Sequence, residues 1–85
     1  MTDKELLQFY TKFYEKDRLT KELQEFLDSR QCFLKNETKG NKELMYMAYD
    51  KIYTSTKGLM VTRQISEDTF FKLKEELSNI DRETV

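Results

Sequence analysis

The chain has 85 residues and a formal net charge of -1, with 15 lysine and arginine residues against 16 aspartate and glutamate residues. A chain of this length can bury one modest hydrophobic core, and 38% hydrophobic with 36% charged residues is typical of a folded domain rather than of disorder. The near-neutral charge argues against a polycation for nucleic acid and against an acidic mimic of DNA.

Two residue types that carry much of protein chemistry are absent or scarce. The sequence has no histidine and a single cysteine, Cys32. Histidine is the usual general base near neutral pH and the commonest metal ligand, so we expect no enzyme, no metal and no cofactor. A lone thiol fits a reducing compartment, and no apolar run is long enough for a signal peptide or a membrane span. These features predict a cytoplasmic chain without a small-molecule substrate.

The first predicted helix begins at Thr2. Thr2 and Glu5 have the spacing of a capping box, in which each side chain hydrogen-bonds the backbone of the other residue. Apolar and aromatic residues then recur on one side of a helix that ends before residues 16–18. They are Leu6, Leu7, Phe9, Tyr10, Phe13 and Tyr14.

A second helix is predicted after this break, with Leu19 as a hydrophobic staple and Thr20 as the N-cap. Its apolar stripe consists of Leu23, Phe26, Leu27, Phe33 and Leu34. Residues 35–41 form the clearest linker, because Gly40 suits a left-handed helix end and Asn41 suits a new N-cap.

The third helix is predicted from Lys42 to about Ser55, closing near Gly58. Its core stripe is Leu44, Ala48 and Ile52, with Met45 on the flank. Residues 59–65 are a short β-rich apolar run, for which we expect an extended connection.

Ser66 is the predicted N-cap of the last helix, with acidic residues in the first turn where the helix dipole favours them. Its core stripe is Phe70, Leu73, Leu77 and Ile80, and residues 81–85 are expected to fray. The pattern as a whole predicts a single all-α domain over residues 1–85. Its architecture is a compact antiparallel bundle of about four helices with a short extended segment before the last one.

A second aromatic row adjoins the core stripe of the third helix. Tyr46, Tyr49 and Tyr53 recur at i, i+3 and i+7, so most of the circumference of this helix is apolar or aromatic. Such a helix is either the buried middle of a bundle or a protein-binding face, since tyrosine is enriched at interfaces. Phe71, outside the stripe of the last helix, is a second candidate residue for binding a protein partner or for contact within a homodimer.

Lys57, Arg63 and Gln64 bracket the expected extended connection. If that connection were a wing after a recognition helix, the order of elements would be that of a winged-helix DNA-binding regulator. The third helix also carries Glu43 and Asp50, which leaves a thin basic face for phosphate. DNA binding is therefore the alternative function, behind protein interaction.

Residues 44–80 carry a family likeness. A helix is followed by Ile65-Ser66-Glu67 and then by the run from Phe70 to Ile80, Phe-Phe-Lys-Leu-Lys-Glu-Glu-Leu-Ser-Asn-Ile. This stretch resembles the later helices of enterocin A-type bacteriocin immunity proteins, although their longer C-terminal tail is lacking. The resemblance implies a cytoplasmic helical bundle that protects its producer by recognising a receptor complex, and it assigns no individual residue.

The same shape would serve a phage- or plasmid-encoded inhibitor of a host protein. The predicted function is therefore a small non-enzymatic protein-interaction or inhibitory module, of which a bacterial immunity protein is the sharpest version.

Overall fold

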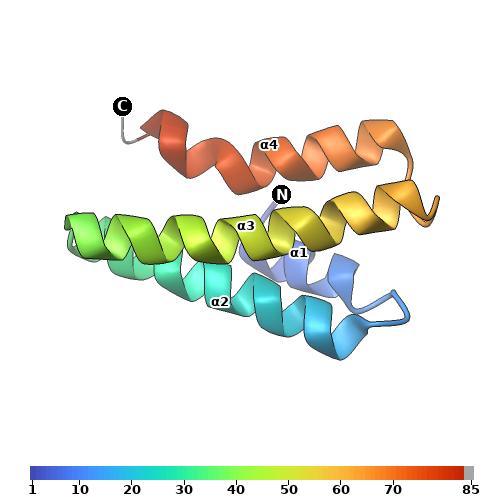
Figure 1. The fold of residues 1–85 in the computed structure, drawn as a ribbon, viewed down its shortest axis with the longest axis horizontal. Coiled ribbons are helices and arrows are strands. Elements are labelled where there is room, and N and C mark those ends of the chain that lie inside the picture. The colour runs from blue at the N-terminus through green and yellow to red at the C-terminus, as the bar shows by residue number, and fades with distance from the viewer. Residues whose placement is uncertain (84–85) are drawn as a thin grey trace. The chain divides into compact units, whose positions relative to one another are not determined.

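The computed structural model describes the backbone of residues 1–83 and the side chains of residues 1–78. Four helices make up this part of the chain, which contains no strand, so the predicted all-α class is confirmed. The helices are α1 (Asp3–Tyr10), α2 (Lys16–Lys35), α3 (Lys39–Val61) and α4 (Glu67–Glu83) (Figure 1).

The helices fall into two compact units, with the boundary inside α3 between Ile52 and Tyr53. The first unit holds α1, α2 and the part of α3 up to Ile52, and α2 runs antiparallel to that part of α3 (Figure 1). The second unit holds the rest of α3 and α4, which again run antiparallel. Each unit is thus built around a helical hairpin.

The core of the first unit lies along α2. Its buried apolar side chains are Leu6, Tyr10, Leu19, Leu23, Phe26, Leu27, Phe33, Met45, Ala48 and Ile52. The short helix α1 is fixed to α2 by an ion pair between Asp3 and Arg30, whose guanidinium also lies 5.9 Å from the ring centroid of Phe26. Burial of α1 through Leu6 and Tyr10 and this polar contact hold it against its neighbour.

The predicted capping box is confirmed. The Glu5 backbone N–H donates to Thr2 Oγ1 at 3.2 Å, and the Thr2 N–H donates to the Glu5 carboxylate at 3.4 Å. The helix ends at Tyr10, which is earlier than the sequence pattern indicates. Phe13 and Tyr14 therefore lie in the turn before α2, where the ring of Phe13 contacts Phe9 and Tyr14 is 95% exposed.

The predicted start of α2 is wrong by one turn. The helix begins at Lys16, and Thr20 lies inside it with its hydroxyl donating to the Lys16 carbonyl at 2.6 Å. A threonine hydroxyl can accept a free N–H at the start of a helix, or it can donate to the carbonyl one turn back inside a helix. The sequence does not distinguish these two roles, and Thr20 therefore looks like an N-cap. At the other end, Leu34 is 47% exposed although it belongs to the predicted stripe.

The linker is shorter than predicted, since α2 ends at Lys35 and α3 begins at Lys39. Thr38 Oγ1 accepts the N–H of Asn41 at 3.2 Å, so Thr38 and not Asn41 caps α3. Gly40 lies in the first turn of the helix and no glycine has a positive φ, which corrects its predicted left-handed role.

The core stripe of α3 is displaced by one residue at its start. Met45, Ala48 and Ile52 are buried, whereas Leu44, which was assigned to the stripe, is 58% exposed. The spacing 45, 48, 52 follows the 3.6-residue period of the helix more closely than repeated steps of four.

The extended connection predicted over residues 59–65 is replaced by helix and a tight turn. Residues 59–61 complete α3, and Arg63 has a φ of 62°, in the left-handed region. The N–H of Arg63 donates to the Met60 carbonyl at 3.0 Å and that of Gln64 to the Leu59 carbonyl at 2.9 Å. This pair of bonds is a Schellman motif, with arginine at the position that glycine usually occupies.

Ser66 caps α4 as predicted, since its Oγ accepts the N–H of Thr69 at 3.1 Å. Phe70, Leu73 and Leu77 are buried, as their spacing indicates. The helix continues to Glu83, beyond the point where fraying was expected. The side chain of Ile80 and residues 84–85 lie outside the described part of the chain.

Candidate protein-binding surface

Three large side chains on the first half of α3 are exposed. Leu44 is 58% exposed, Tyr46 36% and Met47 62%. All three belong to the first unit and lie within one turn of helix. We call these residues the α3 surface.

The helical period explains why these side chains face outward. At 100° per residue, Met45 and Ile52 point to one side of α3, and Met47 lies nearly opposite them. Leu44 and Tyr46 lie on either side of Met47. The Lys42 ammonium lies 5.7 Å from the ring centroid of Tyr46, which gives this edge of the surface a positive charge.

The structure does not expose the three predicted tyrosines equally. Tyr49 is half-buried, with its ring 5.8 Å from that of Phe26 in the first unit. Tyr53 is also half-buried but belongs to the second unit, where its ring lies 5.7 Å from Phe70. Tyr46 is therefore the member of the row with the most accessible ring.

Phe71, the other predicted contact, is 54% exposed on α4. Its ring centroid lies 5.5 Å from that of Phe70, so its inner edge is supported by the core of the second unit. The large exposed aromatic surface is a feature that binding sites share, but Phe71 stands apart from the exposed group on the first half of α3 in sequence.

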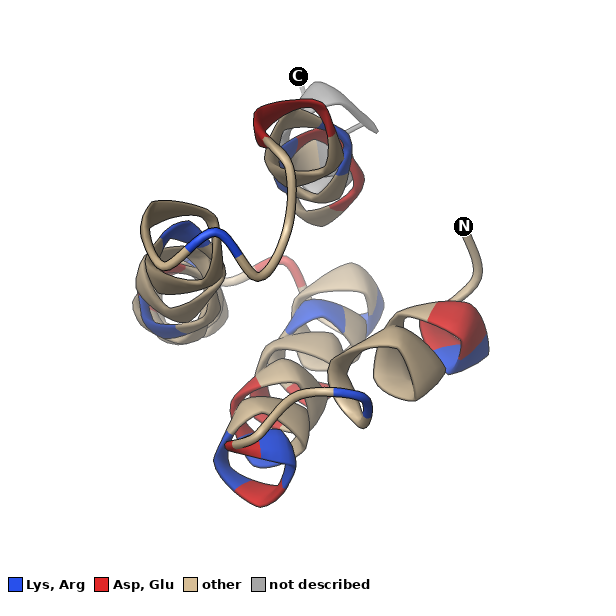
Figure 2. Cartoon of the chain, turned by 90° about the vertical axis from the view of Figure 1, so that its right-hand side faces the viewer, with Lys and Arg blue, Asp and Glu red and all other residues tan. Residues whose placement is uncertain are grey.

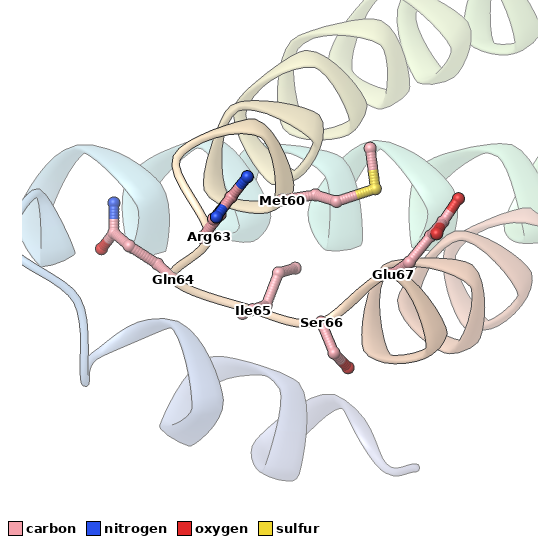
Figure 3. A pocket seen from close by; sticks show the side chains of 6 residues that line it. All are labelled: Met60, Arg63, Gln64, Ile65, Ser66 and Glu67. Atoms are coloured by element: carbon pink, nitrogen blue, oxygen red, sulfur yellow. The ribbon is translucent and has the colours of Figure 1, made fainter.

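The residues of the DNA-binding alternative are all exposed. Lys57 lies on α3, and Arg63 and Gln64 lie in the turn before α4. The turn residues line an open depression of about 520 Å³ together with Met60 and Ile65 (Figure 3). Because the connection is a helix end and a turn, it supplies no extended wing.

Charges of both signs lie side by side on α1 and α2, as Figure 2 shows. Arg18, for example, pairs with Glu15 and Glu22, and the hydrogen bond to Glu15 is the main cause of its raised pKa.

The described residues contain no group of three or more histidine, cysteine, aspartate or glutamate side chains that could hold a metal ion. Cys32 is an exposed free thiol. Among the helices that the structure describes, none is long and apolar enough to cross a membrane.

Sequence reasoning missed Leu44 and Met47 as surface residues. The signal was present, because both fall outside the stripe of Met45, Ala48 and Ile52 once the period is drawn from Met45. The signal was concealed because the predicted stripe began at Leu44.

No protein-family model matches the chain, no curated protein matches it, and no solved structure matches it.

Proposed function

We propose that this chain is a non-enzymatic protein-interaction or inhibitory module that binds a protein partner through the α3 surface. The supporting observation is the outward position of Leu44, Tyr46 and Met47 on neighbouring residues of one helix. Methionine and tyrosine are enriched at protein interfaces, and exposed apolar groups of this kind mark interaction sites. The sharpest version of this proposal is a cytoplasmic inhibitor that acts like a bacteriocin immunity protein.

The mode of binding would be that of a helix face against a partner's groove. Met47 supplies an adaptable, unbranched side chain at the centre, and Leu44 and Tyr46 supply contacts on either side. The Lys42 ammonium beside Tyr46 favours a carboxylate or an aromatic ring on the partner near that edge.

The test is affinity capture from the native host with quantitative mass spectrometry, comparing variants of one tagged chain. Leu44→Lys and Met47→Lys place a charge in the centre of the proposed interface and should lose the partner. Gln31→Lys adds the same charge at an exposed position of α2 and is the matched control. It should retain the partner.

Recovery of the same proteins by all four chains would contradict the proposed surface. Loss of capture with Gln31→Lys as well would show that charge, and not the α3 surface, controls binding. Sedimentation equilibrium of the same variants separates a homodimer from a foreign partner, because only a homodimer dissociates when Met47→Lys is introduced into the pure protein.

A further inference from the structure

Arg63 differs from the other arginines whose side chains the structure describes. Arg18 and Arg30 each pair with carboxylates of their own unit. Arg63 is exposed, and its side chain, unlike its backbone N–H, has no hydrogen bond, ion pair or ring contact with any residue in the described part of the chain. This part of the molecule therefore leaves its guanidinium unpaired.

The backbone does not explain the arginine either. Arg63 has a φ of 62°, where an L side chain is crowded and where glycine is the usual residue at a helix end. A residue type that is costly in this conformation and whose side chain forms no internal hydrogen bond or ion pair is a candidate for function, because backbone strain is found preferentially at functional sites.

The surroundings of Arg63 are ordered on both sides. The Schellman motif fixes the end of α3, and the Ser66 cap fixes the start of α4. Between them lies the open depression of about 520 Å³, with the side chains of Arg63 and Glu67 toward opposite ends and those of Met60 and Ile65 between them (Figure 3). A short turn held from both ends fixes the backbone position from which the guanidinium projects.

We propose that this depression binds a carboxylate of a peptide segment, with Arg63 as the anion-binding group. A guanidinium offers a planar pair of donors that matches a carboxylate. Met60 and Ile65 provide apolar surface for the side chain next to that carboxylate. The site goes beyond the α3 surface and uses different residues.

The local charges favour a peptide over a nucleic acid. Glu67 and Asp68 follow Arg63 closely and lie in the first turn of α4. A phosphate backbone requires several cations in a row, whereas here a single guanidinium is followed in the chain by two carboxylates, which repel phosphate. A single carboxylate can bind at the Arg63 end of the depression, which is the end opposite Glu67 (Figure 3).

The experiment is an NMR titration of the ¹⁵N-labelled protein with three synthetic peptides. One is acetyl-Gly-Leu-Glu-Gly-amide, which carries a side-chain carboxylate, and one is acetyl-Gly-Leu-Leu with a free C-terminal carboxylate. The third, acetyl-Gly-Leu-Gln-Gly-amide, has no charge. We expect saturable shifts of the amides of residues 60–67 with one or both carboxylate peptides, and the stronger of the two identifies the source of the carboxylate.

Variants assign the binding to Arg63. Arg63→Gln should weaken binding about fivefold, the scale of an exposed ion pair, and Arg63→Lys should restore part of it. Lys72→Gln removes an exposed positive charge from α4 and should leave the titration unchanged. Leu44→Lys should also leave it unchanged, so failure of this site and failure of the α3 surface can be told apart.

Arg63→Gly separates a structural role from binding, because it should raise the thermal unfolding temperature while weakening peptide binding. Equal titration of the wild type and Arg63→Gln, or equal binding of the uncharged peptide, would overturn the proposal. Tighter binding of a 12-base-pair DNA duplex than of either carboxylate peptide would overturn it in favour of a nucleic acid.

Discussion

At the scale of single residues, Arg63 provides the clearest energetic prediction. An L residue in the left-handed region costs roughly 1–2 kcal/mol, whereas glycine adopts it freely but loses more entropy on folding. Arg63→Gly should therefore stabilise the protein by about 1 kcal/mol in urea unfolding. Lys57→Gly, inside α3, should destabilise it by about 1 kcal/mol, because there glycine has only its entropic cost. Destabilisation by both changes would show that the arginine side chain contributes to the fold.

The two tyrosines of the α3 row that belong to the first unit, Tyr46 and Tyr49, should respond differently to truncation. Tyr49 is half-buried against Phe26, and Tyr49→Ala should cost about 2 kcal/mol through lost burial and ring packing. Tyr46→Ala should cost less than about 1 kcal/mol, the scale of surface changes, since its ring is more exposed. Thermal or urea unfolding of both variants checks this order, and the reverse order would place Tyr46 in the core.

At the scale of elements, the caps with local partners could be predicted from sequence. Thr2 with Glu5, and Ser66 before an acidic turn, each satisfy a helix start within three residues. The start of α2 could not, because Glu15 forms no side-chain cap bond and gives no signal. The end of α3 could not either, since its left-handed residue is an arginine and the nearest glycine, Gly58, lies inside the helix.

A pair of substitutions tests the observed N-caps. Ser66→Ala removes the acceptor for the Thr69 N–H and should cost about 1 kcal/mol. Thr20→Ala, at the position where the sequence falsely indicates a cap, should change stability by less than about 0.5 kcal/mol, because alanine has the higher helix propensity. A large loss with Thr20→Ala in urea unfolding would restore the predicted helix boundary.

The candidate site could also be predicted in part, to the extent that its signal lies within a single helix. A row of tyrosines at helical spacing identifies α3 as the helix with aromatic residues outside its core stripe. Which ring is covered depends on contacts across helices, such as that of Tyr49 with Phe26, and the sequence periodicity of α3 contains no information on them.

At the scale of the whole molecule, two substitutions test the cores of the two units. Leu23→Ala and Leu77→Ala each remove a side chain that is at most 1% exposed, and each should cost roughly 2–5 kcal/mol. Because the units are distinct, we expect Leu77→Ala to accelerate amide hydrogen exchange in α4 more than in α1 and α2. Equal acceleration in all helices would show that the chain opens only as one cooperative body.

The net charge sets a further expectation for the whole chain. With a formal charge of -1, the protein should show no measurable binding to duplex DNA at physiological ionic strength, because counterion release requires several phosphate contacts. Fluorescence anisotropy with a labelled duplex checks this. Tight binding that is abolished by Lys57→Glu and Arg63→Glu would support the DNA-binding alternative instead.

The passage of α3 through the boundary between the units has a consequence for dividing the chain. Residues on both sides of Ile52 and Tyr53 belong to one helix, whose backbone hydrogen bonds run across the boundary. A polypeptide that stopped at Ile52 would leave the last four carbonyl groups without their helical partners, and one that began at Tyr53 would leave four N–H groups. The units therefore differ from domains joined by a linker. Transferring one unit into another protein would cut α3 at the boundary, so the new protein would have to supply the missing part of that helix.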